Sequence, residues 1–237
     1  MTTLKLLSSM APRECLTAAI EAFEKSQPTR VDAQAAGGVD VARRIEAGEA
    51  VDIVVLADDA IDKLIAGGHL AREGREGLMT SGIAVAIRSK SAKIDVSCES
   101  AVKDAVLAAP ALSYSTGPSG RYLESLFARW GILDQIRARI VVPPPGTPVA
   151  QLVASGKAAL GFQQLSELLN VPGIQVVGPL PGEIQHLTTF TGAVTTKSSN
   201  VAAARAFLRF AASEAVEVIR ARFGMATASR ATSLSGR

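Results

Sequence analysis

Four short loops carry the residues of this sequence that are best suited to binding chemistry, and all four are rich in small side chains. They read SSMAP at 8–12, AAGG at 35–38, STGPSG at 115–120 and PPPGTP at 143–148. Each precedes a segment with the pattern of a helix, where backbone N–H groups and roughly half a positive charge meet a ligand. One such loop would be an ordinary turn. The four together predict a site for a small anion.

The loop at 115–120 has the clearest pattern. Pro118 suits the first turn of a helix, because the N–H that it lacks would have no helical partner there. We therefore expect the N–H groups of Ser119, Gly120 and Arg121 to face the anion. An apolar face at helical spacing follows and should anchor the helix on a sheet: Tyr122, Leu123, Leu126, Phe127 and Trp130. Gly120→Asp should then weaken binding by roughly 2 kcal/mol or more and leave the fold intact.

The charged and neutral polar residues near these loops favour a carboxylate. Arg13, Arg43 and Arg121 each follow one loop closely, and arginine pairs with carboxylates through two parallel hydrogen bonds. The alternative for each is an ordinary solvated helix residue. Neutral donors and acceptors that could share the ligand are Ser115, Thr116, Ser119, Gln163 and Gln164.

The elements that must position these loops alternate regularly along the chain. Short apolar runs at 4–7, 30–34, 51–58, 83–88, 111–115, 139–143, 158–163 and 174–178 predict strands, and amphipathic segments lie between them. This alternation predicts an α/β fold with mostly parallel sheets and helices on both faces. The end differs, with an extended segment at 186–196 and helices at 200–212 and 213–223.

Composition excludes several classes of protein. The 237 residues are 48% hydrophobic and 20% charged, with a formal net charge of +3. Without a Lys/Arg block we expect no nucleic-acid partner. Cys15 and Cys98 stand far apart, with no CxxC and no histidine cluster, so we expect free thiols, no metal and no cofactor. We see neither a signal peptide nor a membrane span, and expect a monomer, periplasmic if a leader was removed and otherwise cytoplasmic.

The segment VARRIEAGEAVDIVVLADDAIDKLI at 41–65 resembles periplasmic molybdate-binding proteins of ABC transporters, a family of type II solute-binding proteins. The order of loops and helices is similar over nearly the whole chain. The resemblance implies one lobe at 1–83 and 190–237, a second at 84–189, two extended crossovers and a ligand cleft between the lobes. It also implies a membrane component of an ABC transporter as a possible partner.

The resemblance implies ligand contacts position by position. A family serine aligns with Ala11, with Ser8 and Ser9 just upstream, and a family tyrosine aligns with Gln164. A serine-rich family loop is replaced here by glycines. Because these hydroxyls are missing or displaced, we expect a di- or tricarboxylate in preference to molybdate or tungstate. The full set of expected ligand-binding residues is Ser8, Ser9, Gly37, Gly38, Ser115, Ser119, Gly120, Arg121, Gly146, Thr147 and Gln164.

Two further stretches, GPSGRYLESLFARWGI and GFQQLSELLNVPGIQVVGPLP, are similar to the branch of this family that includes aconitate isomerase. That resemblance implies an alternative function, the interconversion of cis- and trans-aconitate, which needs an acid and a base. The catalytic residues stay unassigned, with His69, His186, Glu167, Asp58 and Ser9 as candidates. The effector domains of LysR-type regulators use a related fold, but we see no DNA-binding helix-turn-helix.

Overall fold

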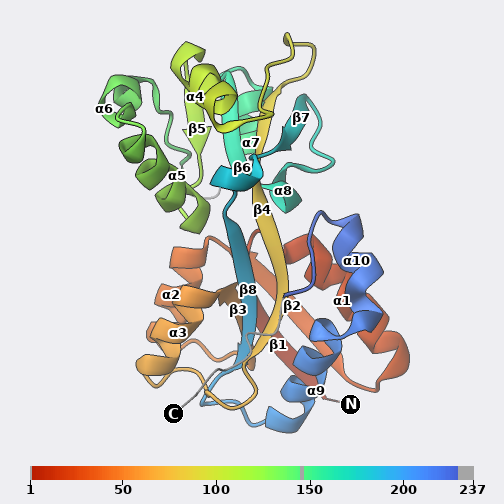
Figure 1. Cartoon of the computed structure of the whole chain (residues 1–237). Helices are drawn as coiled ribbons and strands as arrows, with labels where there is room; N and C mark the ends of the chain where they lie inside the picture. The colour runs from red at the N-terminus through yellow and green to blue at the C-terminus, as the bar shows by residue number, and fades with distance from the viewer. Residues whose placement is uncertain (1, 145–146, 229–237) are drawn as a thin grey trace, which may run out of the picture. The chain divides into compact units, whose positions relative to one another are not determined.

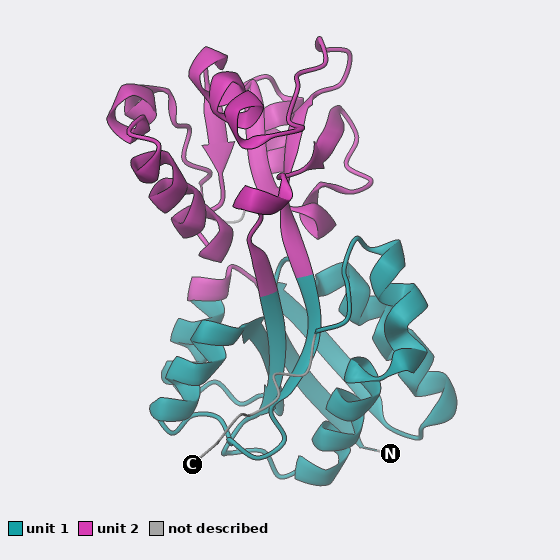
Figure 2. Ribbon diagram, viewed as in Figure 1, with its two compact units in different colours: residues 1–35, 40–80, 189–237 teal, residues 36–39, 81–188 magenta. Residues whose placement is uncertain are grey.

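The computed structural model describes residues 2–144 and 147–228. The chain forms two compact units (Figure 2). Unit 1 comprises residues 1–35, 40–80 and 189–237, and unit 2 comprises residues 36–39 and 81–188. The lobe boundaries and the interlobe cleft expected from the sequence stay predictions. No described helix is both long enough and apolar enough to span a membrane.

Unit 1 is built on a sheet with the strand order β2-β1-β3-β8. Its strands are β1 (Thr3–Ser9), β2 (Arg30–Ala36), β3 (Ile53–Ala57) and β8 (Leu187–Val194). β1 and β3 are parallel, with Leu6 opposite Ile53, whereas β3 and β8 are antiparallel. All five residues of β3 are buried, as expected for an apolar strand covered on both faces.

Helices cover both faces of the unit 1 sheet (Figure 1). α2 (Gly38–Glu46) and α3 (Asp58–Ala66) lie on one face, and α1 (Arg13–Ser26), α9 (Val201–Ala212) and α10 (Glu217–Arg222) lie on the other. α1 buries apolar residues at helical spacing, ending at Phe23, whose ring meets Phe207 of α9 edge-on at 5.3 Å between centroids. Such aromatic pairs stabilise a core beyond the area that they bury.

Unit 2 has a sheet with the order β4-β6-β5, and β7 also pairs with β4. The strands are β4 (Glu76–Arg88), β5 (Leu112–Tyr114), β6 (Leu160–Gln164) and β7 (Ile174–Pro179). β5 and β6 are parallel, whereas β4 is antiparallel to both β6 and β7. The α/β fold class predicted from the sequence is confirmed, and antiparallel pairings by β4 and β8 accompany the parallel ones.

Successive side chains of β4 point to opposite faces of the unit 2 sheet, so each face packs against its own set of helices. Ile83, Val85 and Ile87 pack in one cluster with α4 (Glu99–Ala108) and α5 (Pro118–Arg129). Ala84 and Ala86 pack in another with Ala150 and Leu168. The latter two residues belong to α7 (Val149–Ala154) and α8 (Leu165–Leu168). α6 (Leu133–Ile136) and the short 3-10 helices η1 (Arg137–Arg139), η2 (Gly182–Ile184) and η3 (Glu214–Val216) complete the elements of the described residues.

One predicted strand, at 139–143, is wrong. Residues 137–139 form η1, and Ile140 makes only an isolated bridge to Leu112, beside a hydrogen bond from Val141 N to Leu112 O of 2.8 Å. Pro143 and Pro144 follow directly and have no N–H to donate to a ladder. The apolar run therefore touches β5 and then leaves the sheet.

Candidate functional site

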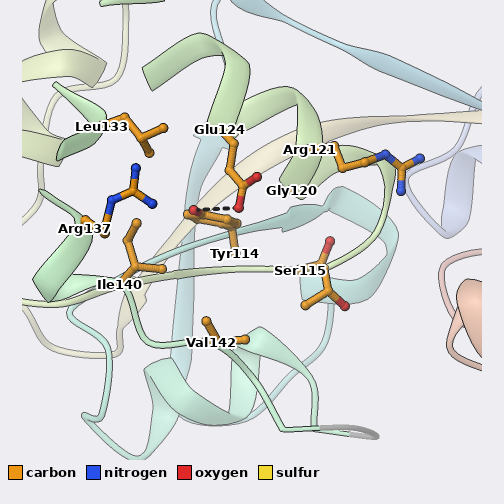
Figure 3. Close-up of a pocket in the computed structure, with 10 residues that line it drawn as sticks. Tyr114, Ser115, Gly120, Arg121, Glu124, Leu133, Arg137, Ile140 and Val142 are labelled. Carbon is orange, nitrogen blue, oxygen red and sulfur yellow. Dashed lines mark hydrogen bonds between the residues drawn. The ribbon is translucent and has the colours of Figure 1, made fainter. Parts of the chain in front are cut away.

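A pocket of about 370 Å³ lies within unit 2, beside the start of α5 (Figure 3). This volume is at the small end of the range for ligand pockets, roughly 300–1,000 Å³. The pocket has a polar end at the 115–121 loop, a charged middle and an apolar wall. It is lined by Tyr114, Ser115, Thr116, Gly120, Arg121, Glu124, Leu133, Arg137, Ile140 and Val142.

The start of α5 presents backbone donors, as predicted, but one fewer than expected. Gly117 is the N-cap residue and Pro118 occupies the first turn. The N–H of Arg121 donates to Gly117 O at 3.1 Å, so that donor is already used within the helix. Pro118 has no N–H group. The backbone N–H groups of Ser119 and Gly120 are therefore the ones in the first turn that have no acceptor within the helix.

Two hydroxyl groups extend this polar end of the pocket. The Oγ atoms of Ser115 and Ser119 lie 2.9 Å apart in one hydrogen bond, in which either hydroxyl can be the donor, and Gly117 N donates to Ser115 Oγ at 3.4 Å. Ser119 is buried and Ser115 is partly buried. The two hydroxyl groups carry two protons, and the hydrogen bond between them uses one. The second proton can be donated to an anion.

Gly120 is required by a close backbone contact. A Cβ atom at this position would lie 1.6 Å from the carbonyl oxygen of Ser115. No side chain fits unless the loop moves, so the expectation that Gly120→Asp would leave the fold intact is wrong. The glycine allows the loop to fold back against the helix, and this contact fixes the orientation of the donors.

The charged middle of the pocket contains Tyr114, Glu124 and Arg137, whose polar ends point toward one another (Figure 3). The phenol of Tyr114 donates to Glu124 Oε1 at 3.3 Å. Burial raises the pKa of Tyr114 to about 12, and the charge of Glu124 and this hydrogen bond add to the rise, whereas Arg137 opposes it. At neutral pH the phenol therefore keeps its proton and acts as a donor.

Arg137 belongs to η1 and supplies positive charge to the pocket wall. Its guanidinium donates to Asp134 Oδ1 at 2.9 Å. The hydrogen bond and the charge of Asp134 raise the pKa of Arg137, and Tyr114 and Glu124 raise it further. Its side chain is 66% exposed, so the ion pair with Asp134 is open to water and to exchange for a ligand carboxylate.

The C-terminal end of β6 forms a second polar group in unit 2. Gln163 Nε2 donates to Glu167 at 2.8 Å, and Gln164 Nε2 donates to Thr188 Oγ1 at 2.7 Å. Among the described residues, the buried Oε1 atoms of both glutamines have no hydrogen-bond partner. Buried polar atoms seldom stay unpaired in folded proteins, which is consistent with the predicted ligand contact at Gln164.

The remaining predicted ligand residues are found at several places. Ser8 and Ser9 end β1 and are buried, and Ser9 Oγ has no hydrogen-bond partner among the described residues. Gly38 begins α2 and Gly37 precedes it. Thr147 N donates to Pro144 O at 2.9 Å. Gly146 lies outside the described residues. The pocket brings together Ser115, Gly120 and Arg121, with Ser119 bonded to Ser115; a role for the others stays a prediction.

The acid–base candidates have structural contacts of their own. Asp58 accepts a hydrogen bond from Thr191 at 2.5 Å and pairs with Arg75. His69 lies in the loop after α3, where its backbone N–H donates to the backbone carbonyl of Leu64. The ring of His186 stacks on Tyr122 at 4.6 Å between centroids. None of these residues lines the pocket.

Sequence reasoning missed most of the pocket. Glu124 could have been found, because it lies four residues after Gly120 and thus on the same helical face. Tyr114 lies one residue before the end of the strand predicted at 111–115, but nothing in the pattern shows which way its phenol points. The remaining lining residues follow α5 in the sequence, and no spacing or motif marks them as part of a site: Leu133, Arg137, Ile140 and Val142.

Comparison with known proteins gives consistent matches over most of the chain. A model described as bacterial extracellular solute-binding protein matches residues 4–226. An aconitate isomerase from Pseudomonas sp is 37% identical over 222 residues, covering 90% of this chain and 84% of the relative. The solute-binding-protein family and the similarity to aconitate isomerase, both inferred from the sequence, are thereby confirmed.

Solved structures show the same fold. The periplasmic molybdate-binding protein of Azotobacter vinelandii aligns with a TM-score of 0.78 at 20% identity, covering 95% of this chain and 100% of that one. The sulfate-binding protein SubI of Mycobacterium tuberculosis aligns with a TM-score of 0.78 at 17% identity, covering 98% and 88%. At these identities the likeness concerns the fold alone.

Proposed function

The chain belongs to the family of bacterial extracellular solute-binding proteins, and on this basis we propose that it binds a small polycarboxylate of the aconitate type. The observation that carries the proposal is the start of α5. There the N–H groups of Ser119 and Gly120 and the hydroxyl pair with Ser115 adjoin a pocket that contains the guanidinium of Arg137. The 37% identity to an aconitate isomerase supports this class of ligand.

The lining of the pocket favours an organic anion over a tetrahedral oxyanion. Leu133, Ile140 and Val142 form an apolar wall, which can cover the carbon skeleton of a ligand but offers nothing to molybdate or sulfate. A guanidinium can pair with one carboxylate while helix N–H groups hold another. A ligand with carboxylates at separate carbons would use both ends of the pocket.

Titration calorimetry with trans-aconitate, citrate, molybdate and sulfate tests the proposal. We expect a tricarboxylate to bind at least tenfold more tightly than either oxyanion. Ser115→Ala should weaken that binding roughly tenfold, since hydrogen bonds to charged groups contribute about 1.5–3 kcal/mol. Ser125→Ala is the matched control, because this hydroxyl lies further along α5 and donates to Arg121 O. Tighter binding of molybdate than of every carboxylate would contradict the proposal.

A second candidate function is isomerisation of the bound aconitate, and the specific observation that favours it is the 37% identical relative named aconitate isomerase. Proton NMR of cis-aconitate incubated with the protein would detect the trans isomer directly. We expect catalytic conversion, with many turnovers per protein molecule. Saturable binding without any conversion would leave the chain as a binding protein alone.

We also propose that the protein acts in the periplasm and, as a binding protein, delivers its ligand to the membrane component of an ABC transporter. The family description and the fold shared with molybdate- and sulfate-binding proteins support this. Fractionation of the native cell should find the protein with periplasmic markers. Recovery with cytoplasmic markers would contradict this location.

A further inference from the structure

We propose that Glu124 is the group that transfers the proton in the isomerisation and that Tyr114 positions it; this inference rests on the second candidate function above. Glu124 lies on α5 four residues after Gly120, which places it about 6 Å further along the helix at 1.5 Å per residue. Helical side chains tilt toward the N-terminus. The carboxylate of Glu124 therefore extends back over the turn that presents the N–H donors.

This spacing suits a small polycarboxylate. If one carboxylate of the ligand is held by the N–H groups of Ser119 and Gly120, the adjoining carbons lie between those donors and Glu124. Gly120 and Glu124 both line the pocket, so a ligand held at the N–H groups has Glu124 on the same pocket wall. A base must come within hydrogen-bond reach of the proton that it removes, and this arrangement allows it.

The carboxylate of Glu124 accepts a hydrogen bond from a buried phenol. Tyr114 is only 7% exposed, and its hydroxyl donates to one oxygen of Glu124, Oε1, at 3.3 Å. Because burial raises the pKa of Tyr114, the phenol keeps its proton, and its hydrogen bond fixes the position of Glu124 Oε1. The other carboxylate oxygen can then face the ligand.

The reaction that this pair could perform balances without any other reagent. Glu124 takes a proton from the methylene carbon of cis-aconitate, and the C–H electron pair becomes part of a new double bond. The old double bond moves its electrons toward its own CH carbon, and this carbon receives the proton. Rotation in the delocalised intermediate before reprotonation gives the trans isomer. One proton leaves and one returns, so nothing is oxidised or reduced.

The surroundings of Glu124 suit the charge that develops in this reaction. The guanidinium of Arg137 points toward Tyr114 and Glu124 from across the pocket (Figure 3). The intermediate carries an additional negative charge on the carboxylate next to the carbon that lost its proton. A nearby cation and helix N–H groups stabilise such charge.

Glu124→Gln tests the assignment, because it keeps the shape of the side chain and removes its basicity. We expect the rate of isomerisation to fall at least 100-fold, and trans-aconitate to bind within about threefold of wild type. In D₂O, uptake of deuterium into the methylene group of aconitate should fall in parallel. Glu124→Asp should retain a measurable part of both rates. Asp104→Asn on α4, which removes an exposed carboxylate outside the pocket, is the matched control and should change neither.

Tyr114→Phe tests the positioning role. We expect kcat to fall about tenfold with KM nearly unchanged, whereas a purely structural role would raise KM and lower the melting temperature together. A Glu124→Gln protein that isomerises at close to the wild-type rate would overturn the assignment and leave the isomerase function intact. A wild-type protein that binds aconitate but neither isomerises it nor exchanges its methylene hydrogen would overturn both.

Discussion

At the scale of the residue, the site depends on one glycine at which the loop meets the helix. The carbonyl of Ser115 occupies the space that a Cβ of residue 120 would need. A larger residue can be accepted only if the 115–117 backbone shifts, and that shift would misalign the N–H groups that we propose bind the anion.

Gly120→Ala should therefore destabilise the protein by roughly 1–3 kcal/mol, the usual cost of overpacking, and weaken trans-aconitate binding more than tenfold. Urea unfolding and calorimetry would measure the two effects. Gly182→Ala is the matched control, because nothing lies within 4 Å of its added Cβ. Normal stability and normal binding in Gly120→Ala would show that the loop is not fixed by this contact.

A second residue-scale effect concerns alkaline pH and the buried Cys15. Burial raises the pKa of this thiol to about 11, from an ordinary value of 9.0. A group whose pKa is higher in the folded state holds its proton more tightly there, so it contributes stability below pH 9 that is lost as pH rises toward 11.

Cys15→Ala should consequently lose less stability than wild type between pH 9 and pH 11, although it starts lower because a buried side chain is shortened. Urea midpoints at several pH values would measure this difference. Cys98→Ala is the control, since Cys98 is exposed and hydrogen bonds to Ser100 lower its pKa. Parallel stability curves for wild type and Cys15→Ala would contradict the prediction.

At the scale of the element, a buried arginine joins the last two helices. Arg220 of α10 is 1% exposed, and its guanidinium donates to Ala211 O and Ser213 O at 2.9 Å each, at the end of α9. These carbonyls belong to the last turn of a helix and its cap, where no helical donor is available. α10 thus caps α9 with a side chain.

Arg220→Met should lower the stability of unit 1 by about 3 kcal/mol, in line with the loss of one partner from a buried charged network. Thermal unfolding followed by circular dichroism would measure it. Arg222→Met, on the same helix but exposed, should change stability by less than about 0.5 kcal/mol. Equal effects of the two substitutions would mean that the buried hydrogen bonds contribute little.

Elements with a strong local signal were predicted well from the sequence. Pro118 and the apolar spacing behind it marked α5, and the structure has that helix at Pro118–Arg129. The run at 139–143 was misjudged because an apolar sequence carries no information about its partner strand, and the prolines after it end the pairing early. Local pattern therefore specified the donors of the site but not the wall facing them.

At the scale of the whole molecule, the α/β class and the solute-binding family followed from the sequence, since strand–helix alternation extends over most of the chain and the 41–65 segment resembles the family. The group formed by Tyr114, Glu124 and Arg137 was not predicted from the sequence. Its members come from β5, α5 and η1, and only the packed fold of unit 2 brings them to one pocket. Charges that meet through tertiary packing leave no spacing rule in the sequence.

The central claim is that a carboxylate of the ligand binds at the start of α5. A crystal structure of the protein with trans-aconitate tests it most directly. We predict a carboxylate oxygen about 3 Å from the backbone nitrogens of Ser119 and Gly120, with the carbon skeleton against Leu133, Ile140 and Val142. Aconitate bound with none of its carboxylates at the N–H groups of Ser119 and Gly120 would contradict the claim.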